Sequence, residues 1–239
     1  CATASRPRCP CKTTAASRAS AASKVAFSAD LGCAPVDNDI RKVFETKTKT
    51  FRHIFAETQD RDPDLGEVHE AFEILRSIQF YAAHKERLEN HRDLLGPNVI
   101  NNTERALKYA LTDVAWAHKE QTALYTRFRH FFKDSDILIC PAASVSPFPH
   151  DQLFVEEING EKMPTYMRWL AMTYALTMAL PSACCLPCGV DHLGMPFGIQ
   201  VVGPIGSDAL VLEVAHALEQ ALAANPETAR PEPDLAALA

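Results

Sequence analysis

The stretch Gly194-Met-Pro-Phe-Gly-Ile-Gln-Val-Val-Gly-Pro204 holds a short, mainly apolar run, residues 197–202, which Gly203 and Pro204 close. A second run, Asp136-Ile-Leu-Ile-Cys-Pro141, is apolar through its centre and ends at Pro141. Short apolar runs bounded by turn residues are typical of strands buried inside an α/β sheet. These stretches therefore predict two buried strands, and the alternating residues 24–29 predict a third.

Apolar residues at intervals of three and four predict helices around these strands. The expected helices span about residues 38–59, 67–90 and 164–179. A further helix is capped by Asn102 or Thr103 and runs to about residue 132, and a last helix is capped by Ser207 or Asp208 and runs to about Leu222. The pair Asn159-Gly160 predicts the turn of a hairpin. Helices that alternate with strands indicate an α/β domain.

The composition is that of an ordinary soluble domain, because 47% of the 239 residues are hydrophobic and 23% are charged. The net charge of −6 makes nucleic acid an unexpected partner. The chain has no run of about twenty apolar residues, so no membrane span is predicted. We expect a cytoplasmic protein.

The two ends differ in composition from the rest. Residues 1–23 hold four basic residues, no acidic residue and no Leu, Ile, Val or Phe, so we expect them to be disordered. This segment could be an organelle transit peptide, the beginning of a fragment or an aberrantly translated leader. Residues 225–239 contain three prolines and are expected to form a frayed tail. The predicted domain is residues 24–224.

The cysteines allow two special interpretations. Cys185-Leu-Pro-Cys188 has the C-x-x-C spacing of redox dithiols, but Pro187 and Gly189 disfavour the helix start that activates such thiols. A zinc site built from these cysteines, Cys184 and His192 would lack the second pair of well-separated ligands. We therefore expect reduced, structural thiols and no metal site.

A search for catalytic motifs finds no G-x-S-x-G elbow, no Gly-rich phosphate loop, no H-E-x-x-H and no pair of adjacent serines. The residues themselves therefore predict no catalytic group and no cofactor.

Five segments in order resemble the C-terminal half of the amidase signature family: residues 25–37, 136–149, 164–169, 183–191 and 194–204. The resemblance covers about residues 24–222 and implies one mixed sheet flanked by helices, incomplete in this chain. The local departures are Leu180-Pro-Ser182, which is displaced by one position, and Cys185, which replaces a usual serine.

The resemblance also implies hydrolysis of amide C–N bonds by a Ser, cis-Ser, Lys triad. All three residues belong to the part of the family upstream of the matching segments, so we expect no catalytic residue in this chain and no activity of the chain alone. The alternative is a non-enzymatic, amidase-like module that binds a partner.

The helix from Pro164 to about Ala179 resembles the one that borders the substrate in this family. Tyr166, Trp169 and Thr173 are therefore the candidate substrate-binding residues. The expected ligand is a small-molecule amide, bound once an N-terminal half completes the site. Without that half, unpaired strand edges favour homo-oligomers or aggregation.

Overall fold

The computed structural model describes residues 20–233, in which five strands form one sheet in the order β2-β1-β3-β7-β6. The strands are β1 (Lys24–Phe27), β2 (Glu57–Asp60), β3 (Ile137–Pro141), β6 (Ser182–Val190) and β7 (Pro196–Gly203). β1 is parallel to both β2 and β3, whereas β7 is antiparallel to both β3 and β6. The expectation of a mixed sheet flanked by helices is confirmed.

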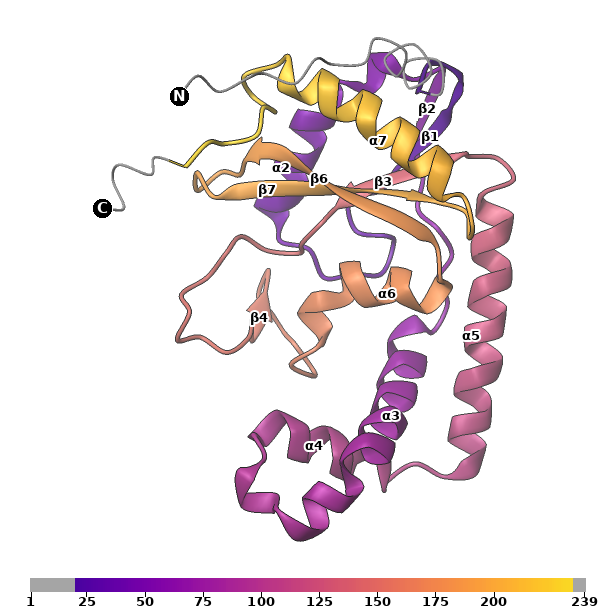
Figure 1. The fold of residues 1–239 in the computed structure, drawn as a ribbon, viewed down its shortest axis with the longest axis vertical. Coiled ribbons are helices and arrows are strands. Elements are labelled where there is room, and N and C mark those ends of the chain that lie inside the picture. The colour runs from indigo at the N-terminus through magenta and orange to yellow at the C-terminus, as the bar shows by residue number, and fades with distance from the viewer. Residues whose placement is uncertain (1–19, 234–239) are drawn as a thin grey trace, which may run out of the picture.

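Helices cover both faces of the sheet (Figure 1). α7 (Asp208–Ala223) packs on β6 and β7 from one face, and α6 (Ala171–Ala179) lies on the other. α3 (Val68–Asn90) and α5 (Leu111–Phe131) contact α6, and α4 (Pro97–Ala106) packs on α3 to form an arm that extends away from the sheet. α2 (Asn38–Lys49) contacts β3.

Short elements complete the chain. β4 (Glu157–Ile158) and β5 (Glu161–Lys162) form the hairpin expected at Asn159-Gly160. Single 3-10 turns occupy Arg52–Ile54, Arg92–Leu94 and Arg168–Leu170. Among residues 20–233, no helix is long and apolar enough to cross a membrane.

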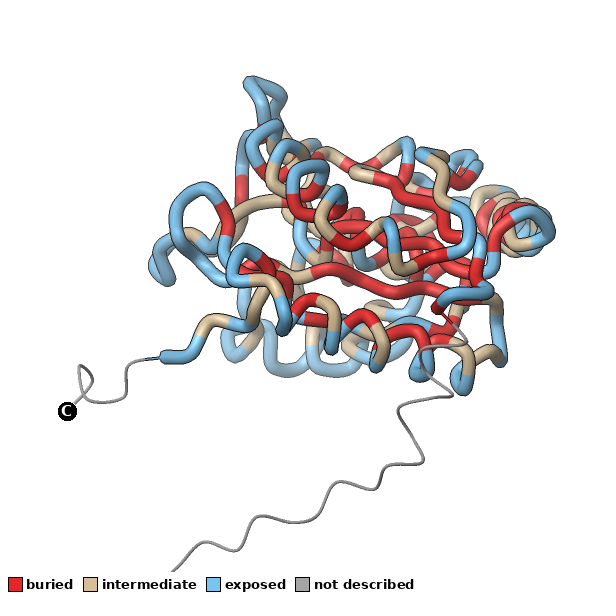
Figure 2. The backbone as a smooth tube through the Cα atoms, turned by 90° about the horizontal axis from the view of Figure 1, so that it is seen from above, coloured by how far each residue is buried: buried red, intermediate tan, exposed pale blue. Residues whose placement is uncertain are grey.

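The core is centred on the middle strands of the sheet, where Figure 2 shows buried backbone running through the molecule. Ile137, Leu138, Ile139 and Cys140 of β3 are all 0% exposed. Gln200 is a buried polar residue of β7, and its side-chain nitrogen donates to the carbonyl oxygens of Pro141 (3.1 Å) and Met172 (3.3 Å). This amide therefore connects β3 and β7 to α6.

The helix expected over residues 38–59 ends early. α2 stops at Lys49, and residues 57–60 form β2, whose sequence Glu-Thr-Gln-Asp is polar. Among the described strands β2 pairs with β1 alone, so its side chains can face water while its backbone is hydrogen-bonded. Periodicity does not reveal β2, because an edge strand needs no apolar pattern.

Three further boundaries differ from expectation. The helix expected over residues 103–132 is two helices, α4 and α5, with residues 107–110 between them. The helix expected from Pro164 begins as the 3-10 turn at Arg168 and becomes α-helical only at Ala171. β6 is longer than the apolar run 183–186 suggested, and it includes Pro187 near a register shift.

Both ends of the described chain pack against the domain. Residues 1–19 of the expected leader lie outside the described residues, whereas 20–22 are helical and both Ser20 and Ser23 are buried. At the other end, Thr228 is buried and donates to the carbonyl oxygen of Leu222 (3.0 Å). The ammonium of Lys47 donates to the carbonyl oxygen of Glu227 (2.6 Å). Residues 225–228 are thus held on the body by hydrogen bonds.

Candidate functional site

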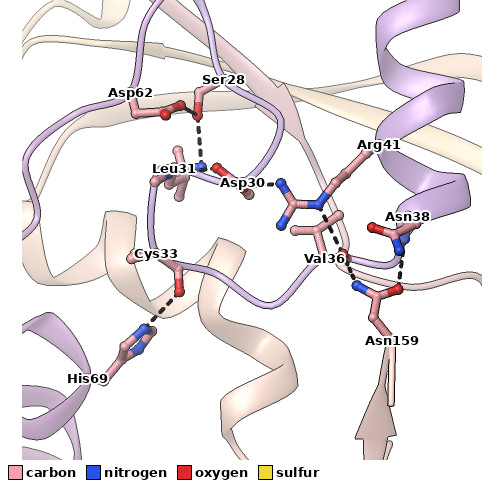
Figure 3. Close-up of polar contacts among 11 residues, drawn as sticks. Ser28, Asp30, Leu31, Cys33, Val36, Asn38, Arg41, Asp62, His69 and Asn159 are labelled. Atoms are coloured by element: carbon pink, nitrogen blue, oxygen red, sulfur yellow. Dashed lines mark hydrogen bonds and ion pairs between the residues drawn. The ribbon is translucent and has the colours of Figure 1, made fainter. Parts of the chain in front are cut away.

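The loop that follows β1 lies at the carboxyl end of the three parallel strands β2, β1 and β3, which is where open α/β sheets place their ligands. The Ser28 hydroxyl donates to Asp62 (2.6 Å) and accepts from the backbone N–H of Leu31 (2.8 Å) (Figure 3). Leu31 has φ +58° and Gly32 has φ +70°, and these left-handed residues turn the chain back from the strand. The carboxylate of Asp30 pairs with Arg41 of α2.

The β4–β5 hairpin is tied to this loop by one side chain. The Asn159 amide nitrogen donates to the Val36 carbonyl oxygen (2.9 Å), and its oxygen accepts from the backbone N–H of Asn38 (3.0 Å). The Arg41 Nε–H donates to the same Val36 oxygen (3.1 Å). The loop is therefore fixed from α2 and from the hairpin at once.

A histidine from α3 connects the loop to α6. His69 Nε2 lies 3.0 Å from the Cys33 carbonyl oxygen, and Nδ1 lies 2.5 Å from the Tyr174 hydroxyl. Because a carbonyl only accepts, Nε2 carries the proton and Nδ1 accepts from Tyr174. Burial lowers the pKa of His69, and the nearby Arg168 charge lowers it further.

Tyr166, the first candidate substrate residue, is directed at the arm. Its hydroxyl oxygen accepts from Arg76 of α3 and from Asn102 of α4, each at 2.8 Å. Asn102 is 2% exposed. Both lone pairs of the tyrosine oxygen are occupied, so its contacts hold the segment before α6 to α3 and α4.

Trp169, the second candidate, lines a cavity of about 230 Å³. Its ring meets Phe148 edge to face, with ring centroids 5.4 Å apart. The cavity also contains Ser146, whose hydroxyl donates to Asp191 (2.6 Å). Burial raises the pKa of Asp191, but the hydrogen bonds from Ser146, Met195 and Leu193 outweigh it and leave the pKa below its usual range. This is an aromatic pocket with one hydroxyl and one ionised carboxylate.

Thr173, the third candidate, is exposed on α6 and is not among the residues that line the aromatic cavity. The structure therefore separates the three candidates: one faces the arm, one lines the aromatic cavity and one faces solvent. The surroundings of His69 and Arg168 could not be predicted from the sequence, because their neighbours come from segments far along the chain. No local spacing signals such neighbours.

The cysteines of the C-x-x-C stretch are free thiols on β6, and Cys185 is exposed whereas Cys188 is buried. Burial raises the pKa of Cys188 to about 11, although the Lys47 charge opposes that rise. A thiol with a raised pKa is a poor nucleophile near neutral pH. In the part of the chain that the structure describes, no three His, Cys, Asp or Glu residues are grouped to hold a metal ion.

Known proteins share the sequence pattern and the fold of this chain. A family model described as Amidase matches residues 2–212. The chain belongs to the amidase family. The match begins at residue 2, whereas the motif resemblance begins near residue 24, so the family match extends into the expected leader.

Among curated amidase-family relatives, the acylamidase of Rhodococcus erythropolis is 25% identical over 88% of this chain and 43% of its own length. One of the subunits of glutamyl-tRNA(Gln) amidotransferase from a Picosynechococcus strain is 35% identical over 45% of this chain and 21% of its own length. The chain thus spans less than half the length of these relatives.

Solved structures show the same fold. A bacterial aryl acylamidase of the amidase signature family superposes with a TM-score of 0.77 at 18% identity. The superposition covers 90% of this chain and 46% of that chain. The described sheet and helices therefore correspond to part of the larger amidase fold.

Proposed function

We propose that this chain forms the C-terminal part of an enzyme that hydrolyses amide C–N bonds, with its nucleophile and base supplied by a segment outside residues 1–239. The supporting observation is family membership combined with coverage, because the chain spans 43% of an acylamidase and 46% of a solved aryl acylamidase. The motif resemblance assigns the catalytic Ser, cis-Ser, Lys triad to the other part of that fold.

The hydrogen bonds of three described serines are in keeping with this division of roles. The hydroxyls of Ser28 and Ser146 each donate to an aspartate carboxylate, and the hydroxyl of Ser207 donates to a backbone carbonyl. None of these three is joined to a lysine or a histidine that could take its proton. A serine without such a base is a weak nucleophile.

In this proposal the aromatic cavity at Trp169 receives the apolar part of the amide. Its walls include Ile40, Phe148 and Phe197, which suit an aryl or branched acyl group. Tyr166 holds the segment that carries Trp169 and does not itself touch the substrate. Thr173 lies on an exposed face of α6 that the remaining part of the fold would cover.

The outer edge of the sheet fits the same proposal. Within the described residues β6 pairs with β7 alone, although it is nine residues long. An edge strand of this length is a template for pairing with another chain. We expect the isolated chain to self-associate, and light scattering with chemical denaturation measures this. A monodisperse monomer that unfolds cooperatively would favour the partner-binding module instead.

Complementation tests the activity. The chain 1–239 is assayed on a panel of aryl and alkyl amides, with and without a carboxylate, alone and after co-expression with the N-terminal part of the Rhodococcus acylamidase. We expect no turnover alone and measurable turnover together, with loss of that turnover when the partner segment's signature serines are replaced by alanine. Stoichiometric labelling of the chain alone by a serine-directed fluorophosphonate, with turnover that needs the labelled serine, would contradict the proposal.

A further inference from the structure

Arg168 is a half-buried cation that has no counter-charge within the described residues. It lies in the turn before α6, and its Nε–H is buried without a hydrogen-bond partner. No described carboxylate forms an ion pair with it. A partly buried charge without a partner is costly, and proteins seldom retain one unless something compensates it.

Three groups on which the Arg168 charge acts are neutral near pH 7. Burial is the main influence on the pKa of Cys33, His69 and Tyr174, and the Arg168 charge acts on all three. Burial raises the pKa of Cys33 to about 12 and lowers that of His69, while the pKa of Tyr174 is also raised. The thiol and the phenol stay protonated and the imidazole stays uncharged, so none of them compensates the guanidinium.

Two of the acids that act on these same groups, Glu73 and Asp30, already have cationic partners. Glu73 accepts from Thr165 (2.6 Å) and from Arg105 (2.7 Å), which uses both of its oxygens. Asp30 pairs with Arg41. The positive charge of Arg168 is therefore available to a ligand.

Arg168 opens on a polar cavity of about 320 Å³ between the loop after β1 and the β4–β5 hairpin. Lys162 of β5 lines the same cavity and also forms no ion pair with a described residue. Of the two other charged residues in the wall, Arg41 is neutralised by Asp30 and Glu161 is exposed. The cavity therefore has two uncompensated cations and one exposed acid.

This cavity and the aromatic cavity are lined by consecutive residues, Arg168 and Trp169. Resting on the function proposed above, we propose that the cavity at Arg168 binds a carboxylate of the substrate, so that the enzyme acts on amides that carry a negative charge. Arg168 is the anchoring cation and Lys162 adds to the positive potential. Guanidinium groups suit this role because their fork of N–H donors matches the two oxygens of a carboxylate.

Calorimetric titration of the full chain with N-benzoylglycine and with N-benzoylglycinamide tests the proposal, because the two probes differ in carrying a carboxylate or an amide at the same place. We expect the carboxylate to bind at least about tenfold more tightly, the scale of a charge-assisted contact. Arg168→Gln should abolish this preference and Lys162→Gln should reduce it. Arg87→Gln, on the exposed surface of α3, should leave it unchanged.

Equal affinity for the two probes, or no binding of either at millimolar concentration, would overturn the proposal. Should Arg168→Gln fail to fold, the preference of the unmodified chain and its reduction in Lys162→Gln still decide the question, because Lys162 is exposed. The readout is binding, so it is separate from the proposed activity. If the complemented enzyme hydrolyses neutral amides and shows no preference for a carboxylate, only the inference about Arg168 is contradicted. If the chain binds the carboxylate through Arg168 but the complemented enzyme hydrolyses nothing, only the proposed activity is contradicted.

Discussion

The central sheet and the arm built from α3 and α4 are held together by different forces. In the sheet, β3 contributes four consecutive residues with no exposed surface. The arm has two exposed leucines at its end, Leu94 and Leu107, and its contacts with the segment before α6 include partly buried hydrogen bonds at Tyr166 and Glu73. Apolar burial therefore stabilises the central sheet, whereas hydrogen bonds and ion pairs hold the segment that carries the candidate site.

The largest effect is expected in the sheet. Ile139→Ala removes buried apolar atoms from the middle of β3 and leaves a cavity, which should lower the free energy of unfolding by about 2–5 kcal/mol. Ile139→Val is the matched control and should cost about 1 kcal/mol. Chemical denaturation of the full chain measures both. Equal, small losses for the two variants would show that β3 is not packed as described.

An intermediate effect is expected in the arm. Arg105→Met removes one of the two partners of Glu73, whose side chain is only 10% exposed. Because Arg105 itself is 26% exposed, we expect a loss of about 1–2 kcal/mol. The control is Arg92→Met, which breaks the exposed Arg92–Glu104 pair of the same arm and should change stability by less than about 0.5 kcal/mol.

If the two arm variants lost equal stability, the polar contacts of Glu73 would contribute no more to stability than an exposed surface ion pair.

A direct readout of the site is also available, because Trp169 is fluorescent. Arg105→Met should alter the emission of Trp169 in a Trp116→Phe background, since Glu73 also holds Thr165. Arg92→Met should leave it unchanged.

The smallest effect is a pH dependence at the junction of arm and sheet. His69 has a lowered pKa in the folded chain, so the unfolded chain binds its proton first as the pH falls. Stability from this group is complete above the ordinary pKa of about 6.5 and is lost below it, at no more than about 1.4 kcal/mol per pH unit. His69→Gln should flatten this part of the profile between about pH 7.5 and 5.5, and exposed His91→Gln should not. An unchanged slope in His69→Gln would mean that burial and the Arg168 charge do not hold the imidazole neutral in the folded chain.

Elements with a strong local pattern were predictable. The apolar runs at 136–141 and 194–204 form β3 and β7, and the expected helix 67–90 is α3 with one residue of difference at its start. The order of short motifs was enough to assign the family, which the family match confirms. Polar β2 was missed, because at the edge of a sheet only the backbone needs a partner.

The sequence by itself determined the fold class, because burial of apolar side chains leaves a periodic record along the chain. It also determined the family, through the resemblance of its ordered motifs to the amidase signature family. Only the tertiary structure decided where the candidate residues lie. It directed Tyr166 at the arm, placed Trp169 in an aromatic cavity and left Thr173 in solvent. It also surrounded Arg168 with neutral groups drawn from residues 33, 69 and 174. These residues are far apart in the sequence but close to Arg168 in the folded chain. The electrostatic environment of a charge depends on distances in space, which cannot be obtained from spacing along the sequence.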